Sequence, residues 1–467
     1  GQIHYPALED CWEKLDFHSL CYGAIKACEA LERAEWELAK ALQEVPEDQR
    51  SRIDLRMEGP FGTLRVTGTG KDEHRYSRPW LIIDLGGDDH WHGSIASNAV
   101  DQRLSLALDL SGDDRYTNTD ALQRSQGAGV LGVGLLLDSV GKDYYDNRGA
   151  GQGMGQLGIG ILLDRRGNDR RKASDSSQGA GFLGIGLCLD GEGDDEYEIL
   201  AEGQGFGCIG GIGVLADASG NDSYYAEPDA AKAGRGDYHS KGAIAANNVQ
   251  GVGAGRRGDG SDGHSYAGGM GMLLDASGAD RYRSGNWSLG TGYWFGMGFV
   301  WDGAGDDVYE SCYFTQASGA HFAMGAIVDD TGNDRHELFE TAGAALGFGW
   351  DFVNALFLDR AGDDVYKAKR ISIGCSMIRS NVFFLDLAGK DHYELGDKKG
   401  LGWCDRREDY DKPRWIVPQN SQTSSVALFL DLGGLDEYVG PAARRNGLSL
   451  PSIKLPLRTR ALFRDRD

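Results

Sequence analysis

A six-residue pattern, Asp-x-x-Gly-x-Asp, occurs twelve times in this chain of 467 residues. Most copies start 25 to 30 residues apart, and their first Asp falls at Asp84, Asp109, Asp138, Asp164, Asp190, Asp217, Asp275, Asp302, Asp329, Asp359, Asp386 and Asp431. An aromatic residue stands two positions after the second Asp in ten copies, and Arg171 and His336 replace it in the other two. A fixed period of this length is typical of stacked repeat proteins. The period therefore constrains the chain to a fold of similar, stacked coils.

The segment before each corner alternates between large and small side chains. Before Asp190, Leu187 and Leu189 are large and apolar, whereas Gly186 and Cys188 take the alternate positions. A period of two residues indicates a β-strand, and we predict that the large residues face the core. The repeated pattern then predicts a corner, because Asp accepts hydrogen bonds from the N–H groups that follow it and Gly tolerates a positive φ. We expect the aromatic residue to start the next strand with its ring inward.

Strand, corner and strand follow one another with no helical segment between the copies. This order predicts an all-β fold, a single-stranded parallel β-helix of about 12 coils with a period of about 26–27 residues, over residues 58–440. A β-propeller needs about 40 residues for each blade and does not fit this period. Residues 1–57 carry apolar residues at helical spacing and predict an amphipathic helical segment, and residues 441–467 form a basic tail. Three segments exceed the period and are predicted insertions: about 226–248, 254–267 and 396–416.

The charge and the apolar content of the chain limit the classes of binding partner that we expect. The formal net charge is −23, which argues against nucleic-acid binding and favours cations, metals or basic protein surfaces. No run approaches 18 apolar residues, so we expect no membrane span. The eight cysteines lack the close spacing of a metal site or of a disulfide framework.

Several corners, such as those in 303–309 and 361–366, resemble the calcium-binding turns of the RTX β-roll proteins. The resemblance implies calcium ions between successive corners, with aspartates of both rows as ligands. The residues that it implicates are Asp138, Asp143, Asp164, Asp169, Asp190, Asp195, Asp302, Asp307, Asp359 and Asp364. Stacked carboxylates about 5 Å apart repel by roughly 1 kcal/mol in water and about 3 kcal/mol at an effective dielectric of 20. Bound cations with oxygen ligands, or hydrogen bonds from the backbone amides of each corner, are the two ways to offset this repulsion.

Two insertions lie between Asp217 and Asp275 and flank a single strand, so we expect them to leave the coil near each other. Loops added to a rigid scaffold often carry function. His239 and His264, with acids nearby, suit a metal site or an acid–base pair, although ordinary surface loops would show the same residues. The ligand-binding candidates are Asp237, Tyr238, His239, Lys241, Asn247, Asn248, Arg256, Arg257, Asp259, Asp262 and His264.

A second histidine pair lies near the first corner. His90 and His92 are two residues apart and share one face of a predicted strand, which is compatible with a metal site. Two exposed histidines without a ligand are the alternative.

The strand face opposite the predicted core carries a glycine strip. It consists of Gly, Gly and then an apolar residue, as in Gly158, Gly160 and Leu162. Such a strip should not face water, and glycine lets another backbone approach closely. We expect the strip to be covered by the N-terminal helices, the basic tail or a second chain, which predicts a protein partner or a homo-oligomer.

Two classes of function fit these features. A regular repeat suits a structural or binding β-solenoid that is part of an assembly, and we favour this interpretation. The resemblance of the corners to RTX turns adds calcium as a stabilising ion, with aspartates that only form the turns as the alternative. Parallel β-helices are often carbohydrate-active, and polysaccharide lyases of that shape are similar in outline. A polysaccharide lyase or glycoside hydrolase acting at the insertion loops is therefore the alternative. The calcium-like corners and the fold analogy predict an extracytoplasmic protein, that is, a secreted, periplasmic or cell-surface one.

Overall fold

The chain forms two compact units in the computed structural model. Unit 1 comprises Gly1–Ala226 and Arg256–Leu274, and unit 2 comprises Glu227–Gly255 and Asp275–Asp467. The structure describes residues 6–59, 61–75, 79–98, 101–240, 242–258, 263–339, 343–405, 425–443, 449–451 and 460–465. Strands dominate both units. The described residues contain four α-helices: α1 (Pro6–Lys14), α2 (Phe17–Glu44), α3 (Glu47–Arg50) and α4 (Ala230–Ala233).

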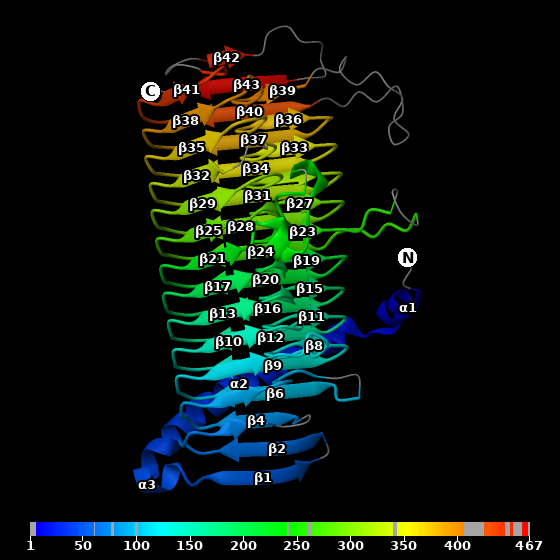
Figure 1. Cartoon of the computed structure of the whole chain (residues 1–467), viewed down its shortest axis with the longest axis vertical. Coiled ribbons are helices and arrows are strands. Elements are labelled where there is room, and N and C mark those ends of the chain that lie inside the picture. Colours follow the sequence, from blue (N-terminus) through cyan, green and yellow to red (C-terminus); the bar gives the residue numbers. More distant parts are fainter. Residues whose placement is uncertain are drawn as a thin grey trace. The chain divides into compact units, whose positions relative to one another are not determined.

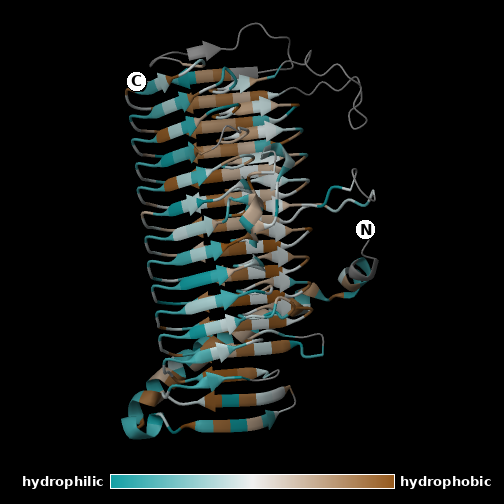
Figure 2. Ribbon diagram, in the orientation of Figure 1, coloured by the Kyte–Doolittle hydropathy of each residue, from teal (hydrophilic) through white to brown (hydrophobic). Residues whose placement is uncertain are grey.

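Each unit is a parallel β-solenoid with helices at its margins (Figure 1). Six of the twelve corners fall in each unit, so the prediction of an all-β parallel β-helix of about twelve coils, with a helical N-terminal segment, is confirmed. Equivalent strands of successive coils pair in parallel, and corner Asp lies opposite corner Asp, as Asp138 does opposite Asp164 in unit 1. Asp302 lies opposite Asp329 in unit 2 in the same way. Hydrophobic residues concentrate on the strands that precede the corners, whereas the strands that follow the corners carry many hydrophilic residues (Figure 2).

The strands of unit 1 form four sheets. Sheet 1 begins with β1 (Asp54–Gly59), which pairs antiparallel with β2 (Gly62–Thr67). It continues with the strand before each corner: β4 (Leu81–Asp84), β6 (Leu104–Asp109), β9 (Val133–Asp138), β12 (Ile159–Asp164), β16 (Ile185–Leu189), β20 (Ile212–Asp217) and β24 (Met270–Asp275), whose last residue belongs to unit 2. Sheet 2 holds the strand after each corner: β3 (Glu73–His74), β5 (His90–His92), β7 (Arg115–Asn118), β10 (Tyr144–Asn147), β13 (Arg170–Ala173), β17 (Glu196–Ile199) and β21 (Ser223–Ala226). Short strands complete the coils: β8 (Gly129–Val130), β11 (Gly155–Gln156), β15 (Gly181–Phe182) and β19 (Gly207–Cys208) in sheet 3, and β14 (Asp175–Ser177) and β18 (Ala201–Gly203) in sheet 4.

Unit 2 repeats this arrangement. Its sheet 1 contains β28 (Met297–Asp302), β31 (Met324–Asp329), β34 (Asn354–Asp359), β37 (Asn381–Asp386), β40 (Val426–Asp431), β43 (Arg460–Asp465) and β42 (Ser449–Pro451). Its sheet 2 contains β25 (Arg281–Arg283), β29 (Val308–Ser311), β32 (Arg335–Leu338), β35 (Val365–Ala368), β38 (His392–Leu395) and β41 (Glu437–Val439). Its short strands are β23 (Gly253–Ala254), β27 (Gly292–Tyr293), β30 (Ser318–Ala320), β33 (Phe348–Trp350), β36 (Cys375–Met377) and β39 (Trp403–Cys404) in sheet 3, and β22 (Ala246–Val249) and β26 (Asn286–Ser288) in sheet 4.

The corners form through the hydrogen bonds expected of Asp, but their glycine is required for a second, steric reason. Asp84 Oδ1 accepts the N–H of Gly86 at 2.8 Å, two residues along the chain. A Cβ atom on Gly141 would overlap the carbonyl oxygen of Gly112, which lies one coil earlier. The corner glycine is therefore required because successive corners stack too closely for a side chain. The rings after the corners point inward and stack, as predicted: the centroids of Tyr116 and Tyr145 are 4.7 Å apart.

The prediction of which face of sheet 1 points inward is wrong. In β12, Gly160, Leu162 and Asp164 point into the solenoid, whereas Ile159 and Ile161 point outward. The reason is that the interior is narrow at this place. The N–H of Ile161 donates to the carbonyl oxygen of Gly127 on the facing side of the preceding coil, at 2.8 Å. The strip that contains Gly160 is therefore covered by the chain's own backbone, and it is not the outer surface that a partner protein could use.

The outward side chains of sheet 1 in unit 1 are covered by α2. Ala24, Ala27 and Leu31 of this helix pack against the row that includes Val133 and Ile159. At the edge of the row, Arg165 Nε pairs with Glu35 at 2.9 Å. The helix begins at the N-cap Asp16, whose side chain accepts the N–H of Ser19. An amphipathic helix thus closes an apolar sheet face that would otherwise meet water.

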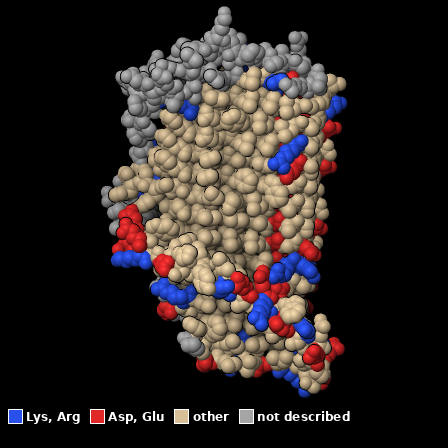
Figure 3. Space-filling model, turned by 180° about the vertical axis from the view of Figure 1, so that it is seen from behind, with Lys and Arg blue, Asp and Glu red and all other residues tan. Residues whose placement is uncertain are grey.

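The equivalent outward face of unit 2 carries no such helix among the residues that the structure describes. We call it the outer face of unit 2 and define it by fifteen side chains of strands β28, β31, β34, β37 and β40. Every one of them is at least partly exposed: Met297, Phe299, Trp301, Met324, Ala326, Val328, Asn354, Leu356, Leu358, Asn381, Phe383, Leu385, Val426, Leu428 and Leu430. All but the two asparagines are apolar, and Asn381 Nδ2 donates to Asn354 Oδ1 at 2.9 Å. A wide area without charged side chains is visible on this side of the molecule (Figure 3).

Candidate functional sites

Two rows of buried aspartates line the inner side of the corners in each unit. The first Asp of a corner accepts a tyrosine hydroxyl from the coil before it, as in Tyr116 Oη to Asp138 Oδ2 at 2.6 Å. The second Asp accepts the N–H of the second Asp one coil earlier, as in Asp114 N–H to Asp143 Oδ1 at 2.6 Å. Tyr282 and Asp302 repeat the first contact in unit 2 at 2.6 Å. The amides that bind the second row thus come from the neighbouring coil and not from the same corner.

Many of these aspartates keep one oxygen without a hydrogen-bond partner among the described residues. In unit 1 these atoms include Asp138 Oδ1 and Asp143 Oδ2, and in unit 2 they include Asp307 Oδ2 and Asp364 Oδ2. Burial, reinforced by the neighbouring carboxylates, raises the pKa of Asp143 to about 12 and those of Asp307 and Asp364 to about 9. A buried carboxylate favours its neutral form unless a cation is present. The rows therefore need either protons or cations at neutral pH.

Arg171 supplies such a cation within unit 1. It takes the place of the aromatic residue, and its guanidinium lies 5.2 and 5.1 Å from the ring centroids of Tyr145 and Tyr197. Its Nη2 is 3.1 Å from Asp164 Oδ2 and pairs with Asp190. Other partners are Asp169 at 3.2 Å and Asp195 at 3.8 Å. Burial of Arg171 opposes its charge, but these carboxylates outweigh burial and raise its pKa. The position shows that a cation fits where two coils meet.

Asp237 and His239 form a pair on the insertion that belongs to unit 2. Asp237 Oδ1 lies 2.7 Å from His239 Nδ1, and Asp237 Oδ2 accepts the Nε1–H of Trp287 at 2.8 Å and the Nδ2–H of Asn286 at 3.1 Å. Burial alone would raise the pKa of Asp237, but the hydrogen bonds from His239 and Asn286 lower it. The ring of His239 stacks on Tyr313, with centroids 4.8 Å apart. A carboxylate-held imidazole beside aromatic rings can serve as a general base or hold a ligand.

The other candidate ligand-binding residues of the two insertions lie in different surroundings. Asn247 is part of the scaffold, because its Nδ2 donates to the Glu227 carbonyl and its Oδ1 accepts the N–H of Gly285. Tyr238 is exposed beside His239, and Asn248 is partly buried with a φ of 53°. Arg256, Arg257 and His264 belong to unit 1, where Arg256 Nη1 donates to the carbonyl of His264. Lys241, Asp259 and Asp262 lie outside the described residues.

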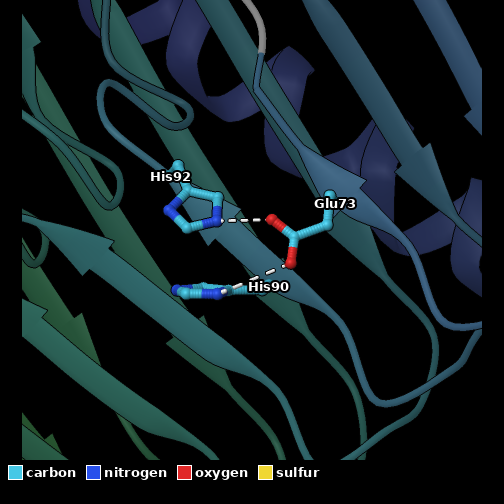
Figure 4. Close-up of side chains that lie close together, drawn as sticks. All are labelled: Glu73, His90 and His92. Carbon is cyan, nitrogen blue, oxygen red and sulfur yellow. Dashed lines mark hydrogen bonds and ion pairs between the residues drawn. The ribbon is translucent and has the colours of Figure 1, made fainter.

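His90 and His92 of β5 meet Glu73 of β3 on the outward side of sheet 2 in unit 1 (Figure 4). Glu73 Oε2 is 2.7 Å from His92 Nε2, and Glu73 Oε1 is 3.9 Å from His90 Nδ1. The two imidazole centroids are 3.6 Å apart. The histidine pair was predicted from the sequence, whereas Glu73 was not.

Three groups of residues at these candidate sites were not predicted from the sequence. Asn286, Trp287 and Tyr313 complete the Asp237–His239 cluster from the following coils, and only the register of sheet 4 would have placed them there. Glu73 lies opposite His90 because β3 and β5 pair in parallel. Arg171 was visible as an exception in the aromatic column, and its position next to two aspartate rows was the available signal.

Comparison with protein-family models, with curated proteins and with solved structures finds no match for this chain. No helix in the described part of the chain is both long and apolar enough to cross a membrane.

Proposed function

We propose that this protein is a structural, partner-binding β-solenoid that works as part of an assembly, and that a second copy of the chain covers the outer face of unit 2. The observation that carries this proposal is the composition of that face. Thirteen of its fifteen outward side chains are apolar, and Met297, Met324 and Phe383 are 40%, 45% and 37% exposed.

The size of the face agrees with an interface. Five strands about 4.8 Å apart, each about 20 Å long, give a flat area of about 480 Å². An apolar patch of this size lies in the range of about 300–600 Å² that is often functional on a monomer. Two such faces together cover about 960 Å², which is close to the roughly 1,000 Å² expected of a specific protein–protein interface. Methionine and aromatic residues are also enriched in interfaces.

Self-association is favoured over other occupants for two reasons. The chain carries a net charge of −23, and an uncharged face is the place where two such chains can approach with the least repulsion. The face is also built of strands, which suits the face-to-face packing of two sheets about 10 Å apart. The α2 helix shows that the equivalent apolar row of unit 1 is covered in the folded protein. A foreign amphipathic helix is the other occupant that the test distinguishes.

The mass of the protein in solution tests this proposal. We expect sedimentation equilibrium to give twice the mass of one chain. Phe383→Arg or Met324→Arg should weaken the dimer by about 30-fold or more, because a buried charge without a partner costs at least about 2 kcal/mol. Leu435→Arg is the matched control, since Leu435 is an exposed apolar residue of unit 2 outside the face, and it should leave the mass unchanged. A native protein that stays monomeric at high concentration contradicts the proposal and directs attention to a helical partner.

We propose that Ca²⁺ neutralises the aspartate rows in those coils where Arg171 does not. Asp114, Asp138 and Asp143 bring carboxylate oxygens within 4.8 Å of one another, and Asp138 Oδ1 and Asp143 Oδ2 have no hydrogen-bond partner among the described residues. Carboxylate oxygens are the ligands that Ca²⁺ prefers, so the donor set fits. In unit 2, the pair Asp302 and Asp307 and the pair Asp359 and Asp364 lie two coils apart, and each pair would hold its own ion in the same way, because each residue has one such buried oxygen. Bound Ca²⁺ would neutralise the rows, and an extracytoplasmic location would suit this requirement.

Thermal unfolding with and without calcium tests this part of the proposal. We expect the melting temperature at pH 8 to rise on adding Ca²⁺ and to fall on adding a chelator, because a ligand bound only by the folded state stabilises it by about 2.7 kcal/mol at a hundredfold excess over Kd. Magnesium at the same concentration is the control for ionic strength. A melting temperature that does not respond to calcium would show that protons neutralise the rows.

A further inference from the structure

We infer that Glu73, His90 and His92 form a surface site for a transition-metal ion of the Zn²⁺ class, with two imidazoles and one carboxylate as ligands. Their three donor atoms lie within 4.8 Å of one another on the outward side of sheet 2 in unit 1 (Figure 4). The site is separate from the aspartate rows, which point into the solenoid, and from the outer face of unit 2.

The distances between the donors fit one small ion. Zn²⁺ binds nitrogen and carboxylate oxygen at about 2.0–2.2 Å, so neighbouring ligand atoms of a tetrahedral site are about 3.4 Å apart. The observed separations of Glu73 from His92 and from His90 are 2.7 and 3.9 Å, which lie on either side of this value. Glu73 is exposed, so its carboxylate can adjust towards this separation without movement of the strands.

Thr117 of the next coil contacts both imidazole rings and favours the tautomers that metal binding requires. Its hydroxyl oxygen is 3.0 Å from His90 Nε2 and 3.4 Å from His92 Nδ1, and it donates to the Trp91 carbonyl oxygen at 3.4 Å. When this oxygen accepts an N–H from each ring, the lone pairs of His90 Nδ1 and His92 Nε2 face Glu73. One outer residue that orients two ligating histidines is the arrangement expected of a metal site.

The chemistry of the ligands selects the class of ion. Imidazole suits Zn²⁺, Cu²⁺ and Ni²⁺, whereas Ca²⁺ and Mg²⁺ prefer oxygen ligands alone. Three protein ligands leave a position open for water or for a group from another molecule. Arg75 also pairs, at 3.1 Å, with Glu73 Oε2, which is the oxygen that faces His92.

Calorimetric titration of the full chain with Zn²⁺, in a buffer with millimolar calcium to occupy carboxylate sites, tests the inference. We expect one Zn²⁺ per chain at this site. The double variant His90→Ala, His92→Ala should lose at least 100-fold in affinity, and Thr117→Val should lose about 10-fold. Because both histidines face outward, we expect the circular dichroism and the melting temperature of the double variant to equal those of the native chain, which would show that its fold is intact.

His392 provides the matched control. It occupies the position in sheet 2 of unit 2 that His90 occupies in unit 1, and it pairs with Glu437 at 2.9 Å. Residue 394, which corresponds to His92, is not a histidine. His392→Ala should leave the Zn²⁺ affinity unchanged. The inference is overturned if the native chain does not bind Zn²⁺, or if the double variant binds it as well as the native chain. An unchanged affinity in Thr117→Val would overturn the role of Thr117.

Discussion

Replacing Gly160 by alanine is expected to destabilise unit 1 by about 3 kcal/mol or more. A Cβ atom at this position would overlap the carbonyl oxygen of Met154, which belongs to the facing backbone. That backbone cannot move away freely, because the Met154 carbonyl accepts the N–H of Gly129 at 2.8 Å and Ile161 N–H donates across the interior at 2.8 Å. The free energy of unfolding, measured with denaturant, is the quantity to compare.

Gly23→Ala is the matched control for this change. Gly23 lies in the exposed part of α2, and a Cβ atom there meets nothing within 4 Å. Alanine in a helix is favoured over glycine by about 1 kcal/mol, so this variant should be as stable as the native chain or more stable. If Gly160→Ala unfolds at the same denaturant concentration as the native chain, the narrow interior described for unit 1 is wrong.

Arg171→Met is expected to destabilise the protein by about 3–5 kcal/mol at pH 8, because it leaves buried carboxylates without their counter-ion. The loss should be smaller at pH 5. The folded-state pKa of Asp169 is about 8 even with Arg171 present, because burial raises it above its ordinary value. A raised folded-state pKa means that the folded protein binds more protons than the unfolded chain between about pH 4 and pH 8. The free energy of unfolding therefore falls as the pH rises through this window, and the variant is most stable at its acidic end.

Two further variants separate the charge of Arg171 from its packing. Arg171→Tyr restores the residue found in most coils, and its hydroxyl can donate to Asp190 as Tyr197 donates to Asp217 at 2.8 Å. It should therefore be less destabilising than Arg171→Met. Arg170→Met removes an exposed neighbour that pairs with Glu196 at 3.3 Å and should change stability by less than about 1 kcal/mol. Equal effects of Arg170→Met and Arg171→Met would contradict the account of the buried cation.

The fold could be predicted from the sequence because its signals are local and repeated. The spacing of the corners indicates a solenoid, and the aromatic column indicates an inward ring. The orientation of sheet 1 could not be predicted from the size of its residues. Leu163 and Ile161 look like core residues, but the interior is too narrow for them, and α2 buries their row from outside. The Asp at the end of each strand was the correct guide, since Asp164 and Leu162 share the inner face.

The candidate sites were predictable only in part, because their residues come from different coils. His90 and His92 are neighbours in the sequence, whereas Glu73 joins them through strand pairing. Asp237 and His239 were predicted from the insertion, but their partners Asn286 and Trp287 are about 50 residues away in the sequence. Such contacts depend on the register between coils, which the repeat fixes at the corners but not in the insertions.

Oxidation of methionine by hydrogen peroxide, followed by mass spectrometry, tests most directly whether the outer face of unit 2 is covered. Met57 of β1 is 54% exposed and serves as the internal reference, whereas Met297 and Met324 are 40% and 45% exposed in the single chain. If a second copy covers the face, Met297 and Met324 should oxidise much more slowly than Met57 in the native protein, and at a rate similar to Met57 in Phe383→Arg. Oxidation of all three at similar rates in the native protein would show that the face meets water and would contradict the proposed assembly.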